Sequence, residues 1–147
     1  MEPPSTLIGK RDAPITLVDL LDWRATEDPA RTAFVFLRNG ETIDRTIDYT
    51  TLRTRARAVA AALEGCATQR ALLLFAPGLD YVAAFLGCLY AGVVAVPAYP
   101  PDPGRIARTL PRLRAMAASS KPTTVLTTSD FLAAAPSFFE QALEFRS

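Results

Sequence analysis

The hydrophobic and polar positions of this chain follow a helical period in some segments and a strand pattern in others. Apolar residues that recur at steps of three and four predict helices. The segments with this spacing are 16–24, 50–63, 80–91, 105–117 and 131–145. Short β-rich or continuously apolar runs predict strands, and these runs are 32–37, 42–49, 71–76, 93–96 and 123–127. Helices and strands therefore alternate along the chain, which is typical of an α/β fold.

Capping and turn residues locate several of the boundaries. Thr16 and Asp80 are the expected N-caps of the first and third helices, because a short side-chain oxygen accepts a hydrogen bond from a free helix N–H group. Thr50 or Thr51 is expected to open the second helix. The Asn39-Gly40 pair lies between two strand-like runs and predicts a tight turn. The first two strands are therefore expected to form an antiparallel hairpin.

The continuous apolar run at 71–76 differs from the earlier strands because it shows no alternation. Its length suits a strand that is buried on both faces of a parallel sheet. Strand 71–76, helix 80–91 and strand 93–96 together predict a right-handed crossover unit. Pro97 is expected to end the second of these strands, and the proline-rich stretch 97–104 is expected to form a loop.

One segment could be mistaken for a membrane span, because residues 82–98 carry almost no charge. The stretch has only about 17 residues, fewer than the roughly 20 that a bilayer requires, and glycine and proline interrupt it. Residues 1–10 contain two prolines and no apolar core, so they do not resemble a secretory signal. We therefore expect a cytoplasmic protein without a transmembrane helix.

Composition excludes several classes of function. With 147 residues, 50% of them hydrophobic and 21% charged, the chain suits one globular domain. The net charge of +1 gives no general attraction to nucleic acid, so no nucleic-acid partner is expected. Histidine is absent, which excludes an imidazole base and the commonest zinc ligand. Cys66 and Cys88 match no metal or redox spacing and are expected to behave as small hydrophobic residues.

A search for catalytic motifs finds no complete active site. Turn 76–80 follows a convincing strand, but it has one glycine and no following lysine, so it lacks the pattern of a phosphate-binding loop. The run 127–130 has no glycine and is better explained as a strand end followed by a helix cap. The carboxylates are scattered without the spacing of an acid–base pair. We therefore expect the opening α/β segment of a larger enzyme.

Two motifs resemble those of the adenylate-forming ligases. Residues 47–52, Ile-Asp-Tyr-Thr-Thr-Leu, resemble their first core motif. Residues 89–97, Leu-Tyr-Ala-Gly-Val-Val-Ala-Val-Pro, resemble their second. Asp48, Thr51 and Tyr90 depart from the threonine, glutamate and lysine that are usual at these positions.

Within that superfamily, the chain is most similar to the fatty acyl-AMP ligases. Segments 75–80, 85–92 and 96–101 are similar to stretches characteristic of that branch, and the likeness extends from about Thr16 to Ala142. The resemblance implies an α/β structure that forms the N-terminal part of the large domain of an adenylate-forming enzyme. Residues 1–147 would be the N-terminal segment of this AMP-binding (adenylation) domain and would end before its phosphate-binding loop.

The resemblance also implies an activity for the full-length enzyme. Such a ligase activates a fatty acid with ATP and Mg²⁺ to acyl-AMP and transfers the acyl group to an acyl-carrier protein. Its phosphate loop, its metal-binding glutamate and the lysine of its C-terminal domain would lie beyond residue 147, so no catalytic, cofactor-binding or metal-binding residue carries over to this chain. We therefore expect the chain alone to be inactive, to bind neither cofactor, and to pack against the remainder of the adenylation domain.

One binding feature is implied for this chain itself. The loop after the second motif lies toward the acyl side in this fold, so Tyr99, Pro100 and Pro101 are candidates to line an acyl channel. A rigid turn between strand and helix explains the same three residues without any ligand. A stand-alone, non-catalytic α/β binding or interaction domain is the alternative function.

Overall fold

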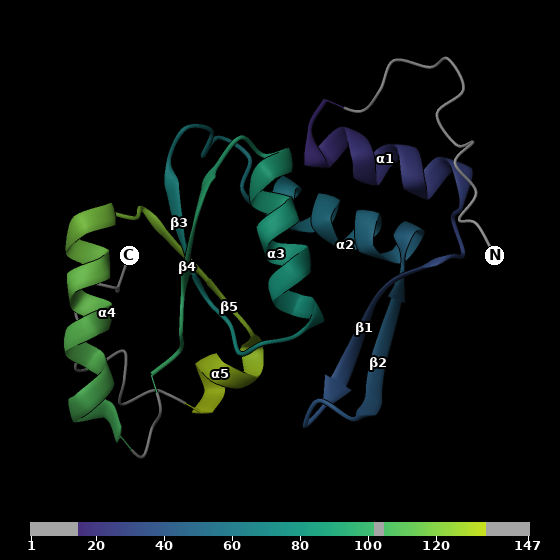
Figure 1. The fold of residues 1–147 in the computed structure, drawn as a ribbon. Helices are drawn as coiled ribbons and strands as arrows, with labels where there is room; N and C mark the ends of the chain where they lie inside the picture. Colours follow the sequence, from purple (N-terminus) through teal and green to yellow (C-terminus); the bar gives the residue numbers. More distant parts are fainter. Residues whose placement is uncertain (1–14, 102–104, 135–147) are drawn as a thin grey trace.

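The computed structural model describes residues 15–101 and 105–134, which form five helices and five strands in alternating groups (Figure 1). The helices are α1 (Leu17–Glu27), α2 (Tyr49–Ala62), α3 (Leu79–Tyr90), α4 (Ile106–Ser120) and α5 (Ser129–Ala134). The strands are β1 (Thr32–Arg38), β2 (Thr42–Asp48), β3 (Arg70–Leu74), β4 (Val94–Ala98) and β5 (Thr124–Thr127). The α/β fold class expected from the sequence is confirmed.

Three strands form a parallel sheet in the order β4-β3-β5, so β3 lies in the centre. Residues 71–74 of β3 have no exposed surface. Because successive side chains of a strand point to opposite faces, Leu72 and Leu74 pack toward α4 and Ala71 and Leu73 pack toward α3. The buried residues that the two helices contribute are Ala84, Cys88, Leu110 and Leu113. The strand is therefore buried on both faces, as its uninterrupted apolar run predicts.

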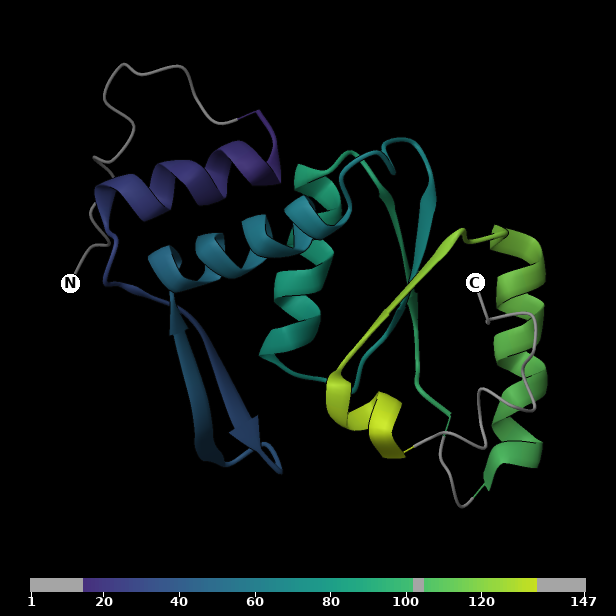
Figure 2. The same cartoon turned by 180° about the vertical axis from the view of Figure 1, so that it is seen from behind.

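Helices α3 and α4 cover opposite faces of the sheet, which the two views in Figures 1 and 2 show in agreement. The chain passes from β3 to β4 at one edge, and then returns across β3 to β5 at the other. Because consecutive parallel crossovers keep the same hand, two crossovers in opposite directions must place their helices on opposite faces. The strand–helix–strand unit expected between residues 71 and 96 is thus present.

A close approach between α2 and α3 joins the N-terminal half of the chain to the sheet. A Cβ atom at Gly87 would lie 2.6 Å from Cβ of Val59 and 2.8 Å from the carbonyl oxygen of Ala56. Real Cβ atoms do not come this close to other heavy atoms, so the two helix backbones can be this near only because residue 87 has no side chain. Tight helix packing therefore depends on glycine at this position.

Strands β1 and β2 form an antiparallel hairpin that projects away from the sheet (Figure 1). Asn39 and Gly40 have φ angles of 54° and 78°, the left-handed conformation that a two-residue hairpin turn requires. Phe36 and Ile47 pack in the same cluster as residues of α1, α2 and α3. The hairpin predicted from the Asn-Gly pair is confirmed.

Two helix starts differ from the sequence prediction, and one agrees. Thr16 caps α1 as expected and forms a reciprocal capping box with Asp19. Helix α2 begins at Tyr49, because the Asp48 carboxylate accepts a hydrogen bond from the Thr51 N–H at 2.7 Å. The N-cap of α3 is Gly78 rather than Asp80. A capping oxygen has to precede the first helical turn, and Asp80 already lies inside that turn.

The remaining differences concern where strands and helices end. Strand β4 continues through Pro97 to Ala98. Among the described residues β4 is an edge strand, so a missing N–H donor on its unpaired side breaks no bond of the sheet. Strand β3 ends at Leu74 rather than at residue 76. Helix α5 starts at Ser129, earlier than the expected 131, and residues 135–145 of that predicted helix lie outside the described part.

The apolar segment and the cysteines have ordinary structural roles. Residues 82–98 divide between α3 and β4, and none of the described helices is long and apolar enough to cross a membrane. Cys66 and Cys88 are both free thiols. Cys88 is buried in the core between α3 and β3, and burial raises the pKa of its thiol. Cys88 therefore acts as a small hydrophobic residue, as the sequence predicts.

Replacement of Gly87 by alanine is expected to destabilise the chain by about 1–3 kcal/mol, because the new methyl group overlaps Val59 and the Ala56 carbonyl. Urea unfolding of the purified chain measures the change. Gly78→Ser is the matched control, because the nearest atom to an added Cβ there lies 4.0 Å away. Equal stability of the Gly87→Ala variant and the original chain would contradict the close packing.

Candidate functional site

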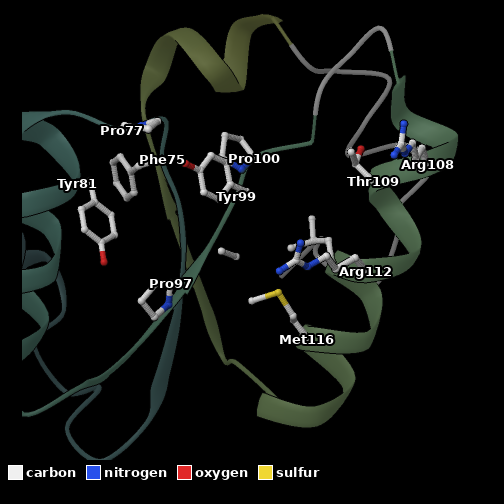
Figure 3. A pocket seen from close by; sticks show the side chains of 12 residues that line it. Phe75, Pro77, Tyr81, Pro97, Tyr99, Pro100, Arg108, Thr109, Arg112 and Met116 are labelled. Atoms are coloured by element: carbon white, nitrogen blue, oxygen red, sulfur yellow. The ribbon is translucent and has the colours of Figure 1, made fainter. Parts of the chain in front are cut away.

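A candidate site is a cavity of about 620 Å³ between strand β4 and helix α4 (Figure 3). Its walls are mainly aromatic, proline and aliphatic, with two arginines on the α4 side. The lining residues are Phe75, Pro77, Tyr81, Pro97, Ala98, Tyr99, Pro100, Arg108, Thr109, Arg112, Leu113 and Met116. A volume of this size suits a small organic ligand, since such pockets commonly measure about 300–1,000 Å³.

The two facing walls come from different local structures. On one side, β4 runs to its end and the chain continues through Tyr99 and Pro100, whose restricted backbone limits the movement of this wall. On the other side, Arg108, Arg112 and Met116 are spaced four residues apart along α4 and therefore share one face of the helix. Arg112 and Met116 extend from α4 toward β4 in Figure 3. The cavity is thus apolar with a cationic wall.

Two of the three residues proposed for an acyl channel lie at this cavity. Tyr99 and Pro100 line it, and the Tyr99 side chain is 77% exposed. Pro101 is buried and is not among the lining residues. Sequence reasoning assigned no role to Arg108, Arg112 or Met116. Their four-residue spacing is a signal that could have placed them on one helix face.

A second, smaller cavity of about 210 Å³ lies at the carboxyl ends of β3 and β5. Turn 76–80 forms part of its wall, together with residues of the hairpin and α5. The Asp80 carboxylate contacts Arg55 at 3.3 Å, so this helix start carries an internal ion pair. On the other side, Oγ1 of Thr128 accepts a hydrogen bond from the Phe131 N–H at 3.2 Å. The helix cap expected in the run 127–130 is confirmed.

The described residues do not form a multi-ligand metal site by themselves. Mg²⁺ is bound by carboxylates and other hard oxygen ligands in near-octahedral geometry. Within residues 15–101 and 105–134, no group of three or more acidic, histidine or cysteine side chains comes together.

A polar cluster outside both cavities links three helices. The Tyr90 hydroxyl of α3 donates a hydrogen bond to Asp22 of α1 at 2.7 Å, and Arg57 of α2 contacts the same carboxylate at 3.1 Å. The Arg57 guanidinium also lies 5.6 Å from the centre of the Tyr90 ring. Burial, followed by the Asp22 hydrogen bond and charge, raises the pKa of Tyr90 to about 12. Although the Arg57 side chain is largely exposed, its contacts hold α1 against α2 and α3.

The family of the chain follows from the comparisons with known proteins. Residues 21–145 match the family described as AMP-binding enzyme. The chain belongs to this family. It is 48% identical over 114 residues to the medium-chain-fatty-acid–[acyl-carrier-protein] ligase JamA of Moorena producens, a match that covers 76% of this chain and 19% of that protein.

Solved structures agree with this assignment. The crystal structure of a fatty acid AMP ligase from Legionella pneumophila has a TM-score of 0.71 and 38% identity, covering 80% of this chain and 20% of that one. A fatty acyl-adenylate ligase from L. pneumophila in complex with acyl adenylate and pyrophosphate has a TM-score of 0.69 and 39% identity. This match covers 79% of this chain and 20% of that chain. The resemblance to fatty acyl-AMP ligases is confirmed, and the chain spans about a fifth of the length of these relatives.

The Tyr90 hydroxyl should give the chain an alkaline dependence of stability. Its pKa is about 12 in the folded chain and near 10 when unfolded, so the folded state holds this proton more tightly. The contribution of the Tyr90 hydroxyl to the free energy of unfolding is therefore complete below pH 10 and is lost as the pH rises toward 12. Tyr90→Phe should cost about 1 kcal/mol at neutral pH. Urea unfolding should show this difference shrinking between pH 9 and 12, whereas a constant difference would contradict the shifted pKa.

Proposed function

We propose that this chain forms the N-terminal portion of a ligase that activates a fatty acid with ATP to acyl-AMP. The observation that supports this most is the combination of fold and sequence similarity to fatty acid AMP ligases along one continuous stretch. That stretch includes both motifs that resemble the adenylate-forming ligases. The named activity of these relatives belongs to proteins of which the matched stretch is only about a fifth, so the remainder of the adenylation domain would supply the chemistry.

The sheet itself supports such a partner. Within the described residues, β4 and β5 each pair on one side only, which leaves an open edge at both ends of a three-stranded sheet. Open edges and exposed apolar side chains are usually covered in a finished domain. The exposed apolar residues of the hairpin are Phe34, Val35, Leu37 and Ile43. This arrangement favours a segment of a larger domain over a stand-alone binding domain.

The acyl chain of the substrate would lie along the cavity between β4 and α4. Tyr99 and Pro100 would form one wall, as the sequence predicts, and Pro101 would support that wall from behind. An aliphatic chain gains stability by removing apolar surface from water, and the aromatic and proline walls offer such surface. The cavity is therefore the site that we propose for the fatty-acid chain.

The partners proposed for the assembled enzyme are suggested by a relative, and its proposed location by the cysteines. JamA is named as a ligase that acts on an acyl-carrier protein, and the same acceptor is proposed here. ATP and Mg²⁺ would be bound by the remainder of the domain, as the resemblance to the fatty acyl-AMP ligases implies. Two free cysteines are consistent with a reducing cytoplasm, and a cytoplasmic enzyme is proposed.

The purified chain should form no acyl-AMP by itself, because the parts that hold the triphosphate are not among its described residues. Residues 16–134 can replace the matching segment of the L. pneumophila ligase, and we expect this chimera to be active. The activities of the isolated chain and of the chimera are measured as fatty-acid-dependent exchange of pyrophosphate into ATP. The L. pneumophila ligase without the matching segment is the control. Turnover by the isolated chain, or a folded chimera that exchanges pyrophosphate without fatty acid, would overturn the proposal.

The Tyr99 ring should influence which acyl chain the chimera prefers. Removing the ring in Tyr99→Ala widens the cavity, so the ratio of kcat/KM for a twelve-carbon acid to that for an eight-carbon acid should rise about tenfold. Steady-state kinetics with the two acids measures this ratio. Leu132→Ala is the control, because Leu132 is also a large, exposed side chain but does not line the cavity. An unchanged ratio in Tyr99→Ala would remove Tyr99 from the acyl wall.

A further inference from the structure

Helix α4 carries a dense positive charge beside the apolar cavity. Residues 105–121 contain four arginines and one lysine but no acidic residue, although the whole chain has a net charge of only +1. Two of the arginines, Arg108 and Arg112, line the cavity. Neither forms an ion pair or a hydrogen bond with another residue in the part of the chain that the structure describes. By contrast, most arginines in the N-terminal half of the chain form ion pairs with acidic residues, for example Arg55 and Arg57.

The chemistry of the wall indicates what would occupy the space. A guanidinium group at an apolar cavity favours a planar anion, because it presents several N–H donors in a fixed geometry. The opposite wall offers Pro97, Tyr99 and Phe75, which attract an aliphatic or aromatic body rather than a second charge. A ligand that satisfies both walls has an apolar chain and a negatively charged end.

We propose that Arg112, assisted by Arg108, recognises the carboxylate of a free medium-chain fatty acid whose chain lies in the cavity between β4 and α4. The proposal rests on the proposed function for the choice of a carboxylate as the anion. It adds that these residues alone capture the acid, before any nucleotide is bound. Arg112 is placed first because its side chain extends toward β4 and Met116 beside the cavity (Figure 3).

Met116 provides a local probe of this site. The chain has two methionines, Met1 and Met116, and only Met116 lines the cavity. Labelling both methyl groups with ¹³C therefore gives two signals, of which one reports on the site. Three ligands are titrated separately into the labelled protein. Octanoate has both a hydrocarbon chain and a carboxylate, octan-1-ol has the hydrocarbon chain without the charge, and acetate has the carboxylate without the hydrocarbon chain.

Octanoate is expected to shift the Met116 signal in a saturable way and to leave Met1 unchanged. Octan-1-ol should bind about tenfold more weakly, because it lacks the charge-assisted hydrogen bonds to arginine. Acetate should cause no saturable shift. Arg112→Gln should lower the octanoate affinity about tenfold while leaving octan-1-ol binding intact, which also shows that the cavity is still folded.

Arg114→Gln is the matched control, since it removes the same charge from the same helix at a position that does not line the cavity. It should leave both affinities unchanged. Equal loss in the Arg112 and Arg114 variants would mean general attraction to a basic helix and would overturn the proposal. Equal affinity of the original chain for octanoate and octan-1-ol would overturn it as well.

The outcome can be separated from that of the proposed function. The chain could bind octanoate through Arg112 while the chimera makes no acyl-AMP. That result would support the capture site and contradict the proposed ligase activity. Conversely, the chimera could be active while octanoate causes no shift of the Met116 signal in the isolated chain. That result would support the ligase activity and contradict the capture site.

Discussion

The central strand β3 constrains the rest of the structure, because its side chains are buried on both faces and its backbone is paired on both edges. Such a strand is stable only when helices cover both faces, and α3 and α4 meet that requirement. The reversal of strand order around β3 then decides which helix covers which face. Helix α1 packs against both α2 and α3, and the hairpin packs against α2. The close contact of α2 with α3 requires Gly87.

The position of the cavity follows from the same arrangement. Parallel strands end at a common edge of the sheet, and ligands of α/β proteins are usually bound beyond these carboxyl ends. Strand β4 ends there and continues through Tyr99 and Pro100, while α4 runs along the adjacent face. The face of α4 that carries Arg108, Arg112 and Met116 borders the space between them, next to the buried Leu113. Arg112 thus lies at an apolar cavity, although nothing in its immediate sequence marks it as a binding residue.

Local signals in the sequence predicted much of this fold correctly. The Asn39-Gly40 turn and the Thr16 cap depend on the conformational preferences and side-chain chemistry of the residues themselves, so they could be predicted from the sequence. Asp80 was wrong as a cap, because a carboxylate near a helix start can also pair with a cation, and Arg55 lies within reach only after α2 and α3 pack together. Pro97 was expected to end a strand, but it is tolerated at the sheet edge.

The sequence by itself therefore determined the order of helices and strands, the burial of β3 on both faces, and the likeness to the AMP-binding enzymes. These properties depend on local periodicity and on continuous motifs. Only the tertiary structure decided that Tyr99 and Pro100 face Arg112 and Met116 across a cavity, while Pro101 lies buried. It likewise decided that Asp22, Arg57 and Tyr90 meet at one point. These contacts join residues far apart in the chain, and their geometry is set by how the helices pack rather than by any local preference.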